Sequence, residues 1–92
     1  MFNHIYVLDA EHHLTGVLSL RELLRADDKQ TMADLMTKEP VTVTPEVRLR
    51  EVARLLVKYG FRAMPVVAAD HAFLGAVRFR DVQPELVRIL KD

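Results

Sequence analysis

The chain repeats one pattern of residues at a fixed distance, and this repeat limits its fold more than any other feature. The segment GVLSLRELL (16–24) returns as GAVRFRDVQ (75–83), 59 positions further along. With this offset and no gap, glycines, acidic residues and aliphatic residues align with residues of their own kind, and Phe2, Val7 and His12 meet identical partners. An ungapped repeat of this length indicates two copies of one supersecondary unit.

The two copies differ in length. The second begins near Thr31 and continues to the end of the sequence, whereas Met1 aligns with Gly60, well inside that copy. We therefore expect residues 1–30 to hold the C-terminal half of the first unit and residues 31–92 to hold the whole second unit. A trimmed chain, or a partial reading of a longer one, would account for the absent leading half of the first unit.

Hydrophobic spacing and turn residues predict a β-β-α order in the first copy. Two short aliphatic strands, 4–9 and 14–19, flank a turn. Helical spacing of leucines follows over 19–28. Ser19 and Glu22 have the spacing of a capping box, in which each side chain bonds a free backbone donor at the helix start.

The second copy is predicted to open with elements that the first copy lacks. A short helix is expected over 31–40 and a brief strand over 41–43. Thr44, followed by proline, has the character of an N-cap and predicts a helix over 44–59, which Gly60 ends.

The remainder of the second copy repeats the first. Strands are predicted over 63–68 and 73–78, and a helix is expected within 81–92. Pro84 fits either the first turn of that helix or a break in it. The complete unit is thus β-α-β-β-α, and the fold class is α+β.

Composition excludes several kinds of function. Thirteen basic and thirteen acidic side chains give a formal net charge of zero, which argues against a nucleic-acid partner attracted by an overall positive field. The chain has no cysteine, which excludes disulfides and thiolate metal sites. Its longest apolar run, 63–69, is too short to cross a bilayer, and no secretory signal is visible. We therefore expect a soluble segment.

Several motifs together resemble the cystathionine-β-synthase (CBS) domain, which commonly occurs in tandem pairs. They are LMTKEPVTVTP (35–45), MPVV (64–67) and the glycine-to-aspartate pattern of 75–81. The sequences of residues 6–27 and 51–67 are most similar to the cytosolic CBS region of MgtE-type magnesium transporters. The resemblance implies a tandem CBS pair whose first repeat lacks its leading strand and helix.

The resemblance also implies a regulatory function. CBS pairs form homodimers, and many bind an adenine nucleotide, such as AMP, ADP or ATP, between the repeats. We expect a module of a membrane-embedded magnesium-transporter-like protein that senses an adenine nucleotide or Mg²⁺, or both, through changes in dimer packing. The alternative is a ligand-free dimerisation module of another CBS protein, CorC-like or free-standing. No catalytic motif is visible, so an enzyme is not expected.

The family's nucleotide signature, Gly-h-h-Ser/Thr-x-x-Asp, identifies four candidate residues. The first copy supplies Ser19 and Glu22, although capping alone accounts for both and glutamate is one methylene longer than the family's aspartate. The second copy supplies Asp81, with Arg78 in place of the hydroxyl. Arg78 either bonds a phosphate through its planar fork or fills the cleft. Asp81, with no hydroxyl beside it, has less reason to act as a cap.

No metal ligand is assigned. Mg²⁺ takes oxygen ligands, and the carboxylates considered are Asp27, Asp28 and Glu85, but this chain has arginines where MgtE-like sequences carry acids. Three histidines fall in the two equivalent turns, at 12, 13 and 71, without the spacing of a zinc site.

Overall fold

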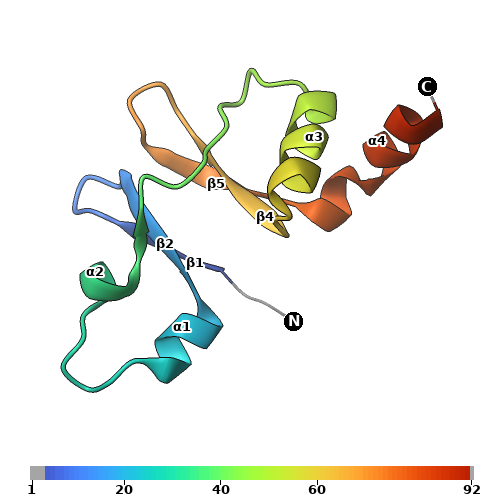
Figure 1. The fold of residues 1–92 in the computed structure, drawn as a ribbon. Helices are drawn as coiled ribbons and strands as arrows, with labels where there is room; N and C mark the ends of the chain where they lie inside the picture. Colours follow the sequence, from blue (N-terminus) through green and yellow to red (C-terminus); the bar gives the residue numbers. More distant parts are fainter. Residues whose placement is uncertain (1–3, 92) are drawn as a thin grey trace.

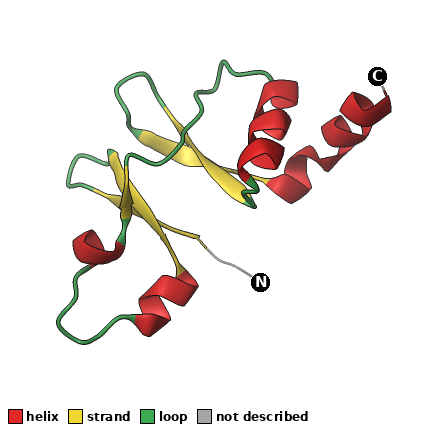
Figure 2. Ribbon diagram, viewed as in Figure 1, coloured by secondary structure: helices red, strands yellow, loops and turns green. Residues whose placement is uncertain are grey.

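The structure is a computed structural model that describes residues 4–91. Two β-hairpins lie side by side, and each leads into helices (Figure 1). In chain order the elements are β1 (His4–Leu8), β2 (Leu14–Ser19), α1 (Leu20–Arg25), α2 (Met32–Leu35), β3 (Thr37–Lys38), α3 (Leu49–Tyr59), β4 (Ala63–Val67), β5 (Phe73–Arg78) and α4 (Phe79–Lys91). Figure 2 shows both hairpins between α1 and α2 on one side and α3 and α4 on the other. This is the mixed helix and strand class that the sequence predicts.

The two hairpins have the same register. His4 lies opposite Ser19 in the first, and Ala63 lies opposite Arg78 in the second. Each hairpin has one register shift, at the same relative position in β1 and in β4. The repeated sequence therefore produces repeated pairing, as predicted.

The tips of the hairpins contact each other symmetrically. The N–H of Leu14 donates to the carbonyl of His71 at 3.2 Å, and the N–H of Phe73 donates to the carbonyl of His12 at 2.9 Å. Each bond is the repeat of the other, so a pseudo-two-fold axis relates the hairpins. The two histidines at equivalent positions of these turns have a positive φ, 70° for His12 and 74° for His71. The two copies therefore share one shape and associate.

A third strand, β3, extends the first hairpin and was not predicted. It lies antiparallel to β2, with Gly16 opposite Lys38. The helix predicted over 31–40 is wrong in its second half, because α2 ends after 4 residues. Met36 then crosses close to β2, where a Cβ added to Gly16 would lie 2.5 Å from the Met36 sulfur. The absent side chain at position 16 makes this close passage possible.

The segment before α3 also differs from the prediction. The strand expected over 41–43 is reduced to one parallel bridge to β4, at Val43. The N-cap predicted at Thr44 is wrong, because α3 begins at Leu49 and its N-cap is Arg48, which makes no side-chain cap hydrogen bond. The first three residues of this helix are exposed, and its buried face begins at Val52.

The ends of the remaining helices follow the sequence more closely. Gly60 ends α3 in the left-handed conformation, at φ 66°. α4 begins at Phe79, two residues before the predicted segment, so Pro84 lies in its second turn without dividing it. No helix in residues 4–91 is both long enough and apolar enough to cross a membrane.

Most of the hydrophobic core lies in the second copy. Both α3 and α4 pack on the β4–β5 hairpin around six buried residues: Val43, Val52, Ala53, Leu56, Met64 and Val82. By contrast, α1 and α2 contain no buried residue. The difference arises because the described part of the first copy has no helix equivalent to α3.

Candidate functional site

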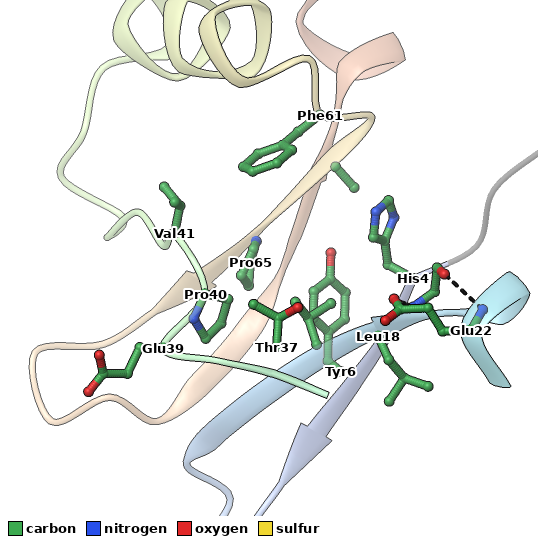
Figure 3. Close-up of a pocket in the computed structure, with 13 residues that line it drawn as sticks. His4, Tyr6, Leu18, Glu22, Thr37, Glu39, Pro40, Val41, Phe61 and Pro65 are labelled. Carbon is green, nitrogen blue, oxygen red and sulfur yellow. Dashed lines mark hydrogen bonds between the residues drawn. The ribbon is translucent and has the colours of Figure 1, made fainter. Parts of the chain in front are cut away.

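A cleft of about 300 Å³ lies between the two hairpins (Figure 3). Its volume is at the lower end of the range for small-molecule sites. The lining comes from β1, β2, the start of α1, the segment around β3, and the start of β4, and consists of His4, Tyr6, Val17, Leu18, Ser19, Glu22, Thr37, Glu39, Pro40, Val41, Phe61, Ala63 and Pro65. Neither copy forms this cleft alone.

Ser19 and Glu22 lie at the edge of the cleft and form the predicted capping box. The N–H of Glu22 donates to the Ser19 hydroxyl oxygen at 3.1 Å, and the N–H of Ser19 donates to Glu22 Oε1 at 2.9 Å (Figure 3). The Ser19 hydroxyl, which accepts in this cap, still has its own hydrogen to donate. Capping therefore accounts for the position of both side chains and leaves both able to contact a ligand.

Arg78 and Asp81, the corresponding residues of the second copy, do not line the cleft. Asp81 Oδ2 accepts from the N–H of Arg78 at 3.1 Å and from its Nε at 3.0 Å, while Oδ1 accepts from Nη2 at 3.0 Å. The prediction that Asp81 has less reason to cap is therefore wrong, because it bonds the backbone of Arg78 as Glu22 bonds Ser19.

The ion pair also changes the titration of both groups. Hydrogen bonds from the Arg78 guanidinium, and then its backbone N–H, hold the pKa of Asp81 below the usual carboxyl value. The same side-chain bond raises the pKa of Arg78. Both oxygens of Asp81 are thus engaged by one arginine, in the two-pronged geometry that guanidinium and carboxylate favour.

Tyr6 is a cleft residue that sequence reasoning missed. Its hydroxyl is buried, and within the described chain it has no hydrogen-bond partner. Burial raises the pKa of this hydroxyl, and the ring contacts Phe73 with centroids 5.3 Å apart. In Figure 3 the hydroxyl points between β1 and β4. In the alignment of the two copies Tyr6 corresponds to Pro65, which lies on the opposite wall of the cleft.

Glu39 is a second lining residue that was not foreseen. Its φ is 53°, in the left-handed region that non-glycine residues rarely adopt. This turn lets the chain leave β3 and continue along the cleft through Pro40 and Val41. Glu39 lies within the CBS-like motif 35–45, but that motif assigned it no contact with a ligand.

Comparison with known proteins identifies the fold. Residues 32–88 match the family model described as CBS domain. The chain belongs to the CBS domain family. The magnesium transporter MgtE of Thermus thermophilus is 40% identical over 79 residues, which is 86% of this chain and 18% of the transporter. This CBS chain thus spans less than a fifth of that relative.

Solved structures give the same result. The cytosolic domain of the Mg²⁺ channel MgtE in complex with ATP superposes with a TM-score of 0.85 at 40% identity, covering 88% of this chain and 33% of that one. The CBS protein CBSX2 in complex with AMP superposes with a TM-score of 0.79 at 31% identity, covering 95% of this chain and 72% of that one. The predicted resemblance to an MgtE-type CBS region is confirmed.

This CBS chain has several carboxylates and histidines of the types that bind metal ions. Among the residues that the structure describes, no three His, Asp or Glu side chains come close enough to hold a metal ion. The ring of His13 contacts Asp9 at 3.3 Å and Glu11 at 3.7 Å, within one turn. The side chain of Glu85 lies outside the described part of the structure.

Proposed function

We propose that this chain is a regulatory CBS pair from the cytosolic part of a transporter related to MgtE, and that an adenine nucleotide binds in its cleft. The observation that carries the proposal is that both copies line the cleft, with Ser19 and Glu22 of the family signature at its edge. A ligand held there favours the arrangement of the hairpins that binds it most tightly. In this proposal residues 1–30 belong to the first repeat and 31–92 to the second.

The cleft offers suitable groups for a nucleoside. Phe61, Pro65 and Val41 provide an apolar surface for the base. The Tyr6 hydroxyl, which has no partner within the described chain, gains one if it bonds the ligand. The carboxylate of Glu22 can accept from ribose hydroxyls. The ATP and AMP complexes of the two similar structures support this assignment of ligand class.

The equivalent position of the second copy is proposed to be closed. Of the two roles predicted for Arg78, its pairing with Asp81 argues against the phosphate contact, because Nε and Nη2 already donate to the carboxylate. The Arg78 side chain is 58% exposed, so the ion pair, and not the filling of a cavity, closes this position. One nucleotide per chain is therefore expected.

Association with a second copy and a response to Mg²⁺ are further parts of the proposal. Several large apolar side chains are exposed, including Leu24 at 76%, Val57 at 57% and Leu74 at 57%. Burying such groups against a second chain is the ordinary way to remove them from water. Regulation by Mg²⁺ rests on the likeness to MgtE, and no residue of this chain is assigned to it.

A second candidate is a dimerisation module without a ligand. The observation in its favour is that both signature positions already have partners within the chain, one in a capping box and the other in an ion pair. In that case the cleft is a gap between repeats and the chain serves only to associate.

Thermal unfolding with AMP, ADP, ATP and Mg²⁺ separates the two candidates. At a ligand concentration of one hundred times Kd, binding adds about 2.7 kcal/mol to the free energy of unfolding. For a domain of this size that raises Tm by about 10 °C or more. An unchanged Tm with every nucleotide, on a chain shown to be folded and dimeric, would refute the sensor and support the ligand-free module.

A further inference from the structure

The charges of the cleft are unusual for a site that holds a polyphosphate. Two carboxylates line it, those of Glu22 and Glu39, and among the described residues no lysine or arginine does. Figure 3 shows the Glu22 carboxylate on the side of the cleft near His4 and Tyr6, with Glu39 at the other end. A phosphate chain in this space therefore meets two carboxylates without a lysine or arginine in the described lining to balance them.

The helix beside the cleft does not compensate for this charge. α1 has only 6 residues, so its dipole is small, and the N–H of Glu22 in its first turn is already bonded to Ser19. Anion sites at helix starts depend on unbonded N–H groups aimed at the ligand. The capping box removes one such donor and places a carboxylate beside it.

The remaining lining is suited to a neutral, partly aromatic ligand. Its walls are mainly apolar, and the Tyr6 hydroxyl is a buried polar group without a partner in the described chain. A phenolic hydroxyl can donate to or accept from a neutral base or a sugar. Nothing in this set needs a negative charge on the ligand.

We propose that the cleft selects adenine ligands of low negative charge, so that adenosine binds more tightly than AMP and AMP more tightly than ATP. The inference rests on the proposed function and refines its ligand class. The expected order arises because the lining carboxylates repel the phosphates, and this repulsion weakens as salt is added.

Isothermal titration of the whole chain with adenosine, AMP and ATP, in EDTA and at low salt, tests the order. ATP is expected to bind about tenfold or more weakly than adenosine, a difference of about 1.4 kcal/mol, and the gap should narrow at high salt. ATP binding as tightly as adenosine, or more tightly, overturns this inference and leaves the proposed function standing. If none of the three binds, the proposed function fails and the inference fails with it.

The substitution Glu22→Gln isolates the charge. Glutamine can still accept from the Ser19 N–H, so the capping box is kept. Any lost ribose contact weakens the binding of both ligands alike. Because removing the charge relieves repulsion only for ATP, the Kd of ATP divided by the Kd of adenosine should fall severalfold. Glu46→Gln, at an exposed position outside the cleft, removes the same charge and should leave the ratio unchanged. An unchanged ratio in Glu22→Gln would show that lining charge does not set the selectivity.

Discussion

Replacing Gly16 with alanine should destabilise the chain through one contact. A Cβ at position 16 would lie 2.5 Å from the sulfur of Met36, 2.7 Å from its Cγ and 3.0 Å from its Cβ. Overpacking of this kind costs about 1–3 kcal/mol. At about 4–8 °C per kcal/mol for a domain of this size, a loss of about 2 kcal/mol lowers Tm by roughly 8–16 °C.

A double-mutant cycle with Met36→Ala tests this cause. The second substitution removes the two nearest atoms and should reduce the cost of Gly16→Ala to less than about 1 kcal/mol. Urea unfolding of the four variants measures the coupling. If Gly16→Ala lowers the free energy of unfolding equally in the wild-type chain and in the Met36→Ala variant, the contact with Met36 is not the cause. Because the chain after Met36 lines the cleft, the single variant should also weaken nucleotide binding, and Met36→Ala should restore it.

Three further predictions concern individual side chains. Tyr6→Phe should weaken adenosine binding about tenfold by titration, while the free energy of unfolding stays the same or rises, because a buried hydroxyl without a partner is removed. Leu56→Ala, at a fully buried core position, should cost about 2–5 kcal/mol in urea unfolding. Arg78→Ala should leave nucleotide binding unchanged or add a second site; weaker binding would instead support a phosphate contact. Because pairing lowers the pKa of Asp81, its contribution to stability is present above the usual carboxyl value and is lost as pH falls through the lowered pKa. Arg78→Ala should therefore reduce the acid dependence of unfolding.

The duplication could be predicted because it needs only a comparison of the chain with itself. The repeated positions predicted both hairpins, and Gly60 marked the end of α3. The fold predictions that were wrong concerned the ends of helices and strands in 31–49, where the chain contacts segments distant in sequence. Thr44 and Pro45 have good local N-cap chemistry, yet they lie in a turn in which the N–H of Val47 donates to the carbonyl of Thr44, and α3 begins only at Leu49.

The cleft was only partly predictable for a related reason. Ser19 and Glu22 came from a local motif, and the structure places both at the cleft. The motifs that contain Tyr6 and Glu39 assigned neither residue to the ligand site, and each faces the cleft only because another segment folds across from it. The pairing of Arg78 with Asp81 is local in sequence, but deciding between a phosphate contact and a filled position required the side-chain geometry.

The two copies have the same backbone hydrogen bond at the start of the helix, but they differ in charge there. In both, the acidic side chain accepts from the N–H three residues before it, at 2.9 Å for Glu22 and 3.1 Å for Asp81. The difference lies in the residue that the acid caps. A serine carries no charge to neutralise Glu22, so the negative charge of Glu22 remains at the cleft, whereas the arginine of the second copy pairs with Asp81. The hairpins are related by a pseudo-two-fold axis. The replacement of serine by arginine is therefore enough to give the two equivalent helix starts different charges.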